Sequence, residues 1–91
     1  MMTEKRFTEL YTDAQFSAYI GKMLARFYRQ YKSTFDDNAI DLDDISQECW
    51  ASLYESADDL KDKNYYSICI RNATIDLLKS LNTELSIQFE E

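Results

Sequence analysis

The sequence predicts an all-α domain, compact and built from three or four helices. The chain of 91 residues contains no proline and a single glycine, Gly21. A sheet protein of this length needs turn residues at every hairpin, and this chain has almost none of them. Three stretches space their apolar residues at helical intervals, at about 13–33, 41–56 and 63–81. Since 91 residues suffice for only one modest core, we expect a single domain covering 1–91.

The first predicted helix, about 13–33, has the clearest amphipathic pattern. Thr12 is its expected N-cap, with Gln15 as the capping-box partner. Residues 1–12 hold a short apolar patch, which we expect to form a first turn or a packing arm. The helix keeps its apolar spacing through the following residues: Phe16, Ile20, Met23, Leu24, Phe27, Tyr28, Tyr31 and Phe35.

The polar side of this helix carries a basic stripe formed by Lys22, Arg26 and Arg29. Two interpretations of the stripe are open. Either it is a solvated face that pairs with the protein's own acids, or it contacts nucleic acid or an acidic protein surface.

The charge of the chain is unevenly distributed. Its net charge is −7, but the first third is rich in Lys and Arg, whereas the stretch 36–62 holds ten acids against one lysine. Phosphate neutralisation supplies most non-specific nucleic-acid affinity, so the net charge argues against a free-standing nucleic-acid binder. This uneven distribution of charge favours an adaptor with two differently charged surfaces. The alternative is that the acidity only keeps a small domain soluble.

The second predicted helix, 41–56, follows a polar connection at 33–40. The helix dipole favours the acids that crowd its start, Asp41, Asp43 and Asp44. Its apolar stripe is formed by Leu42, Ile45, Cys49 and Leu53. The opposite side forms an acidic ridge suited to a basic partner helix, made of Asp44, Gln47, Glu48, Ala51 and Glu55. We expect Trp50 and Tyr54 beside the ridge to be packed or half-exposed.

The third predicted helix, 63–81, follows a charged turn and is expected to be capped by Asn64 or Asp62. Its main buried stripe is formed by Tyr66, Cys69, Ile70, Ala73, Leu77 and Leu81. Ile68 and Ile75 lie on a different side, with Asn72. A helix that is apolar on two sides is either central to a bundle or covered from outside. The tail, 82–91, is expected to fray or to lie as an extended arm on the bundle.

Two motifs in the last two helices resemble region 2 of bacterial sigma factors, in particular the small extracytoplasmic-function type. The first is Asp44-x-x-Gln47-Glu48 followed by an apolar run. The second is Arg71-Asn72-Ala73-Thr74-Ile75-Asp76-Leu77-Leu78-Lys79. The resemblance covers roughly 16–81, and it rests on the order and separation of the motifs.

The resemblance implies two sets of contact residues. In the family, the first motif belongs to the helix that binds the coiled-coil clamp of the RNA polymerase β′ subunit, which implies a polymerase-binding role for Asp44, Gln47, Glu48, Ala51 and Glu55. The second belongs to the helix that reads and opens the promoter −10 element, which implies DNA binding by Tyr65, Tyr66, Arg71, Asn72 and Lys79. The alternative for the tyrosines is that Tyr66 belongs to the core and Tyr65 is a half-buried cover.

The chain departs from the family pattern in two places. Few basic residues follow the Asp-Leu-Leu motif, so electrostatic support for promoter DNA is thin. The tail is also too short for the helix-turn-helix domain that reads the −35 element. We therefore expect a separate −35-reading protein, or an anti-sigma factor, as a further partner. Two alternatives remain open: a sigma-mimicking inhibitor that binds polymerase without DNA, and an unrelated acidic helical module that self-associates through Ile68 and Ile75.

The residue types argue against other classes of function. With no histidine and no Gly-rich loop, we expect no enzyme and no cofactor. Cys49 and Cys69 fit small buried hydrophobes better than a zinc site. No apolar run is long enough to span a membrane, and we expect a cytoplasmic protein with reduced thiols.

Overall fold

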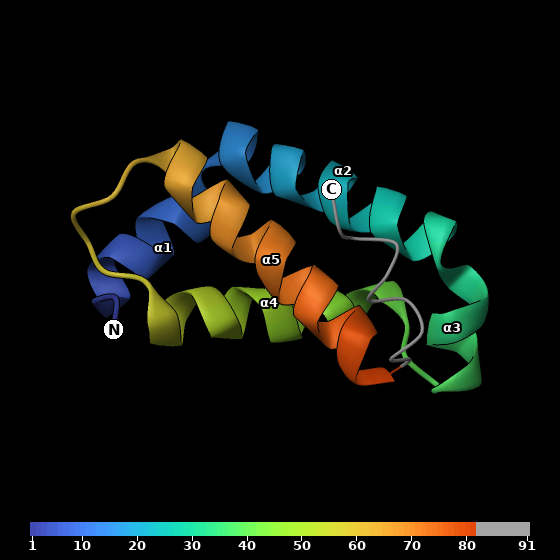
Figure 1. The fold of residues 1–91 in the computed structure, drawn as a ribbon. Helices are drawn as coiled ribbons and strands as arrows, with labels where there is room; N and C mark the ends of the chain where they lie inside the picture. The colour runs from blue at the N-terminus through green and yellow to red at the C-terminus, as the bar shows by residue number, and fades with distance from the viewer. Residues whose placement is uncertain (82–91) are drawn as a thin grey trace.

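A computed structural model of the chain describes residues 1–81 and confirms the all-α class (Figure 1). This range forms five helices and no strand, so there are more helices than the three or four predicted. Their bounds are α1 Glu4–Thr12, α2 Ala14–Gln30, α3 Lys32–Asp37, α4 Leu42–Ser56 and α5 Lys63–Leu81. The last two agree with the predicted 41–56 and 63–81 to within one residue. The tail predicted to fray or to form an arm, 82–91, lies outside the described residues.

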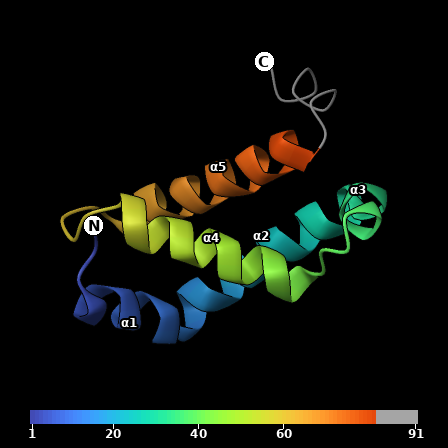
Figure 2. The same ribbon diagram turned by 90° about the horizontal axis from the view of Figure 1, so that it is seen from below.

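The three longest helices form the body of the domain. α5 packs against both α4 and α2, α4 also packs against α2, and α1 and α3 each pack against α2. Figure 2 shows α4 between α1 and α5, with α2 behind it and α3 at one end. The two-helix contact of α5 explains why it is apolar on two sides. Its residue Ile75 is buried, whereas Ile68 is 48% exposed. Of the two residues named for the self-association alternative, only Ile68 is therefore exposed.

The core is filled by apolar side chains from all five helices and by Met2, which precedes α1. The larger of those with almost no exposed surface are Met2, Leu10, Ile20, Leu24, Phe35, Ile45, Leu53, Tyr66, Ile70 and Leu78. This burial supplies most of the stabilising free energy of a domain this small.

One buried polar contact joins α4 to α5. Cys49 Sγ lies 3.2 Å from Thr74 Oγ1, and this hydroxyl donates to the carbonyl of Ile70 at 3.0 Å. Since the single hydroxyl proton is used there, the Cys49 thiol donates to Thr74. Burial raises the pKa of the Cys49 thiol. The prediction of a buried apolar role is confirmed for Cys49, while Cys69 is half-buried at the edge of the core.

Within residues 1–12, Glu4–Thr12 form a complete helix, α1, where only a turn or an arm was predicted. Thr3 is its N-cap, accepting from the N–H of Arg6 at 3.2 Å. The helix lays Phe7 and Tyr11 against Trp50 of α4, at ring-centroid distances of 5.8 and 5.1 Å. Trp50 is consequently only 6% exposed. The packed alternative for Trp50 is therefore the correct one.

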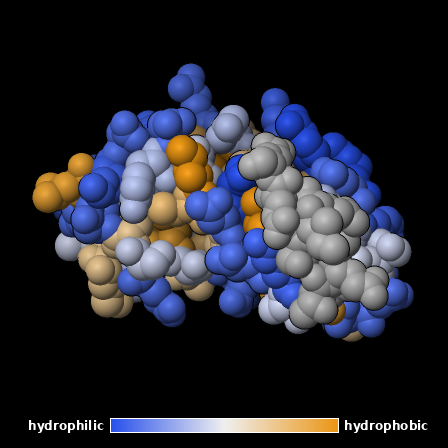
Figure 3. Space-filling model, in the orientation of Figure 1, coloured by the Kyte–Doolittle hydropathy of each residue, from blue (hydrophilic) through white to orange (hydrophobic). Residues whose placement is uncertain are grey.

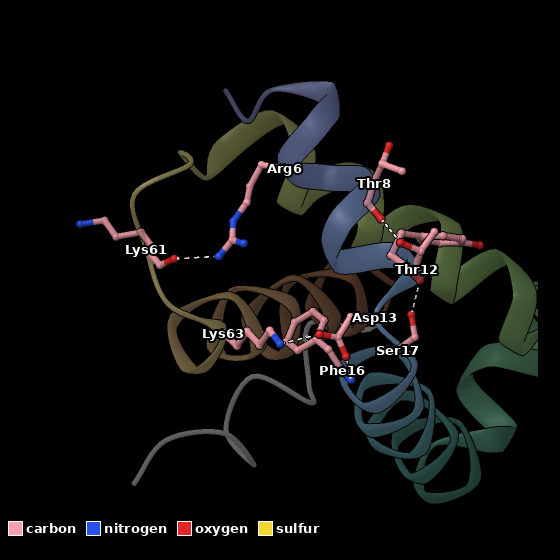
Figure 4. Close-up of polar contacts among 9 residues, drawn as sticks. Arg6, Thr8, Thr12, Asp13, Phe16, Ser17, Lys61 and Lys63 are labelled. Carbon is pink, nitrogen blue, oxygen red and sulfur yellow. Dashed lines mark hydrogen bonds and ion pairs between the residues drawn. The ribbon is translucent and has the colours of Figure 1, made fainter.

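A single residue, Asp13, forms the corner between α1 and α2 (Figure 4). The predicted N-cap at Thr12 is wrong, because Thr12 still belongs to α1 and its hydroxyl donates to the carbonyl of Thr8. Asp13 caps α2 instead, accepting from the N–H of Phe16 at 2.9 Å. Its other carboxylate oxygen binds Lys63 at the start of α5. The corner is thus tied directly to the third helix of the body.

The first predicted helix, 13–33, is divided at Tyr31. α2 ends at Gln30, and the chain continues as the short helix α3 at the end of the bundle (Figure 1). The change of direction places Phe35 in the core with no exposed surface, stacked on Tyr28. The segment predicted as a polar connection, 33–40, is therefore partly helical because Phe35 requires burial.

Candidate functional site

The five residues predicted to bind polymerase lie on one exposed side of α4. Asp44, Gln47, Glu48, Ala51 and Glu55 are all exposed, and we call this surface the α4 ridge. The opposite side of the same helix is buried, as predicted, and contains Ile45, Cys49 and Leu53. The ridge is therefore a surface that the fold does not need for its own core.

Two ridge residues have partners within α4. Asp44 and Asp41 form a capping box, in which the N–H of Asp44 donates to Asp41 Oδ1 at 2.9 Å and the N–H of Asp41 donates to Asp44 Oδ2 at 3.2 Å. Gln47 donates its amide to Asp43 Oδ2 at 3.1 Å. Among residues 1–81, no hydrogen bond or ion pair holds Glu48 or Glu55. These two carboxylates are thus available to a cationic partner.

A hollow lies along each edge of the ridge. On the α1 edge, a hollow of about 450 Å³ is lined by Glu4, Phe7, Thr8, Gln47, Trp50, Ala51 and Tyr54. On the α5 edge, a hollow of about 230 Å³ is lined by Glu48, Ser52, Ala73, Asp76, Leu77 and Ser80. The position of α1 beside the ridge was not predicted, because the spacing of Phe7 and Tyr11 indicates an apolar face without indicating which helix it covers.

The residues predicted to bind DNA do not form one surface. Tyr65, Asn72 and Lys79 recur at intervals of seven and so share one face of α5. Tyr65 is 43% exposed and Asn72 is exposed, whereas Lys79 is half-buried. Lys61 lies over the ring of Tyr65, with Nζ 5.3 Å from the centroid. This face therefore offers an aromatic ring, an amide and two cations.

Tyr66 and Arg71 lie elsewhere. Tyr66 has no exposed surface, and its hydroxyl donates to the carbonyl of Asp58 at 2.7 Å. The alternative that places Tyr66 in the core is the one the structure has, so Tyr65 is the tyrosine of this pair that a base can reach. Arg71 is exposed and lines a hollow against α2 together with Lys22 and Arg26.

The loop between α4 and α5 is fastened to the N-terminal segment. Thr3 donates its N–H and its hydroxyl to the two carboxylate oxygens of Asp59, each at 2.8 Å. These bonds hold the pKa of Asp59 below its ordinary value. Asp62, one of the two predicted caps, accepts from the N–H of Tyr65 at 2.8 Å. The bonds of Thr3 to the loop and the cap formed by Asp62 therefore hold the start of α5, and with it Tyr65, in place.

Comparisons with known proteins do not assign the site. No family model, curated protein or solved structure matches the chain. The resemblance of the two motifs to sigma factor region 2 therefore stays a prediction. In the structure the α4 ridge is exposed, and the five residues predicted to bind DNA are divided between the Tyr65 face, the core and the hollow against α2.

Two further properties bear on the class of site. Within the described range, no group of three or more His, Cys, Asp and Glu side chains is placed to hold a metal ion. In residues 1–81, no helix combines the length and the apolar character that crossing a membrane requires.

Proposed function

We propose that this protein binds core RNA polymerase through the α4 ridge, docking on the clamp helices of the β′ subunit as a sigma-like region 2 would. The observation that carries the proposal is the continuity of the ridge. The five motif residues Asp44, Gln47, Glu48, Ala51 and Glu55 occupy one exposed side of a helix whose other side is buried.

The chemistry of the ridge suits a partner helix rich in arginine. Glu48 and Glu55 present carboxylates without partners in residues 1–81, and Gln47 presents an amide on the same exposed side of the helix. Carboxylates accept paired hydrogen bonds from guanidinium groups, and such charge-assisted bonds contribute about 1.5–3 kcal/mol each. A basic, arginine-bearing surface is therefore the complementary partner.

The shape of the ridge suits the same partner. Ala51 lies at its centre, where a small side chain permits close approach of another helix. The hollows on the α1 and α5 edges give large side chains of the partner a place to enter. A helical hairpin that straddles α4 would use the ridge and both hollows at once.

Promoter contact forms the second part of the proposal. The face of α5 that carries Tyr65, Asn72 and Lys79 offers an aromatic ring for stacking on an unpaired base and an amide for its edge. Its few cations support little affinity for DNA on their own. We therefore propose that a separate protein reads the −35 element, and that polymerase holds the two together.

A pull-down of core RNA polymerase tests the first part. Wild-type protein and the variant Gln47→Ala/Glu48→Ala are compared in moderate salt. Asp44 is left unchanged, because its loss would also break the capping box of α4. The matched control is Gln15→Ala/Glu9→Ala, which removes the same two functional groups from exposed positions on α2 and α1.

Capture by the wild type and by the control, with at least tenfold weaker capture by the ridge variant, is the expected result. Equal capture by all three proteins would move the interface away from the ridge. Absence of capture by a folded wild type would overturn polymerase binding altogether. A transcription assay with captured complexes then separates a promoter-reading factor from an inhibitor.

A further inference from the structure

Within residues 1–81, the hollow between α2 and α5 is lined by several cationic side chains and by no acidic one. It measures about 370 Å³, which is within the usual range of small-ligand sites. Lys22, Arg26 and Gln30 of α2 line one side of it, and Arg71 of α5 lines the other. None of the side chains that line it is acidic, although the chain carries 17 Asp and Glu residues. We call this hollow the α2–α5 groove.

The cations of the groove are not neutralised by the part of the chain that the structure describes. The two ion pairs there are Lys32 with Asp36 and Lys63 with Asp13, and neither involves a groove residue. Figure 3 shows hydrophilic residues gathered over α2. The basic stripe therefore does not form ion pairs with acids of residues 1–81, as one of its two interpretations required. Like charges gathered at one surface favour a ligand with several negative charges.

Aromatic side chains line the same groove. Tyr19 is 58% exposed, and Phe27 is half-buried, stacked on Tyr31 with ring centroids 6.4 Å apart. Unpaired bases stack on such rings, whereas the bases of a duplex are already stacked on one another. Cations beside exposed aromatic faces are the usual combination in proteins that bind single strands. An acidic peptide would use the cations but would leave Tyr19 without a role.

We propose that the α2–α5 groove binds a single strand of nucleic acid. Lys22, Arg26 and Arg71 contact successive phosphates, and Tyr19 stacks on a base. This inference deepens the promoter-contacting part of the proposed function and rests on it for the origin of the strand. It also adds three cations to the two that the Tyr65 face offers.

Fluorescence anisotropy with short labelled strands tests the proposal without polymerase. The probes are oligo(dT), oligo(U) and a duplex of the same length, at low salt. The groove variant is Arg26→Gln/Arg71→Gln, and the control Lys5→Gln/Lys32→Gln removes the same charge from α1 and from α3. All four substituted residues are exposed, and circular dichroism checks that each protein is folded.

The wild type is expected to bind one or both single strands more tightly than the duplex. The groove variant should bind at least tenfold more weakly, and its slope of log affinity against log salt should be smaller by about 1.4, since each phosphate contact on a single strand contributes about 0.7. Tyr19→Ala should weaken binding at least fivefold. The control should stay within about twofold of the wild type. The two single-stranded probes separate DNA from RNA as the source of the ligand.

Three results would overturn the proposal that the groove binds a single strand. These are absence of single-strand binding by folded wild type, preference for the duplex, and an equal loss in the control, which would mean that overall charge and not the groove determines the affinity. Polymerase capture by the same preparations keeps the two proposals separate. A protein that captures polymerase through the ridge but binds no strand refutes the groove alone.

Discussion

Ala39 occupies a backbone position that favours glycine. Its φ is 56°, and it follows Asn38 at the C-terminus of α3. The N–H of Ile40 donates to the carbonyl of Phe35 at 2.9 Å, and that of Ala39 donates to the carbonyl of Asp36 at 3.1 Å. These two bonds form a Schellman motif, in which glycine is the common residue. A side chain in the left-handed region costs about 1–2 kcal/mol, so this helix end is strained.

Gly21 presents the opposite mismatch. It lies in the middle of α2, is exposed, and has a negative φ. A Cβ added there would meet no atom within 4 Å. Glycine in a helix interior destabilises by about 0.5–1 kcal/mol relative to alanine because the unfolded chain gains more freedom. The only glycine of the chain is thus placed where alanine would serve better.

We predict that Gly21→Ala and Ala39→Gly each raise the free energy of unfolding by about 0.5–1 kcal/mol. Urea denaturation followed by circular dichroism measures the change. Ala18→Gly, at an exposed position of α2, is the control and should lower stability by a similar amount. A loss of stability in Ala39→Gly would mean that the left-handed turn after α3 is not adopted in solution.

At the scale of elements, the sequence predicted α4 and α5 well because each carries its own signals. α4 has an acidic start and one apolar stripe, and α5 has Asp62 as its cap. The bounds of α1 and α3 were not predicted. Phe7 and Tyr11 pack on Trp50 of α4, Phe7 also packs on Tyr54, and Phe35 is buried by a turn at the end of the bundle. Such tertiary partners are not readable from local spacing.

The corner at Asp13 connects three helices through one carboxylate. Hydrogen bonding to Lys63, and then to the N–H of Phe16, holds the pKa of Asp13 below its ordinary value. Since the folded pKa is lower than the unfolded value of about 3.9, the charged carboxylate stabilises the folded state above that pH. The stabilisation is lost as the pH falls through the folded pKa, because the unfolded chain takes up the proton first.

We predict that Asp13→Asn lowers the Tm at pH 7 and that its difference from the wild type shrinks as the pH falls below about 4. Asparagine still caps α2, so the variant removes the ion pair and keeps the cap. Thermal melts between neutral and acidic pH provide the measurement. Asp36 and Asp59 also have lowered pKa values, but they titrate in both proteins and cancel in the difference. A difference that does not change with pH would assign the effect to geometry and not to charge.

Lys63→Gln is the matched variant on the other side of the corner. It should reproduce the Asp13→Asn deficit, and the double variant should lose less than the sum of the two, because both single changes break the same contact. Independent, additive losses would show that Asp13 and Lys63 do not act as a pair.

At the scale of the whole molecule, the two candidate surfaces differ in how far the sequence could predict them. The α4 ridge lies within one helix, so periodicity alone brings Gln47, Glu48 and Ala51 to one side. The α2–α5 groove needs Arg71 beside Lys22 and Arg26, and only the packing of α5 on α2 achieves this. The basic stripe of α2 could be predicted from the sequence, but the position of Arg71 opposite that stripe could not. The same packing explains why Arg71 separates from Asn72, its neighbour in the motif.

The charge of the whole chain opposes compact folding. A net charge of −7 on 91 residues creates self-repulsion, and the acids concentrated in the stretch 36–62 lie close together along the chain. The two ion pairs of residues 1–81 are on the surface, where such pairs add little stability. Salt therefore screens more repulsion than attraction within the molecule. Between the acidic ridge and a basic partner, salt screens attraction instead.

We predict opposite salt responses for stability and for binding. Raising sodium chloride from about 0.02 M to about 0.5 M shortens the Debye length from roughly 20 Å to roughly 4 Å and should raise the Tm by about 2–5 °C. Capture of core RNA polymerase should weaken over the same range. Chloride is used because sulfate stabilises proteins by exclusion from their surface. A Tm that falls with salt would mean that attractive pairs dominate the fold, and capture that does not change with salt would remove the electrostatic basis of the ridge.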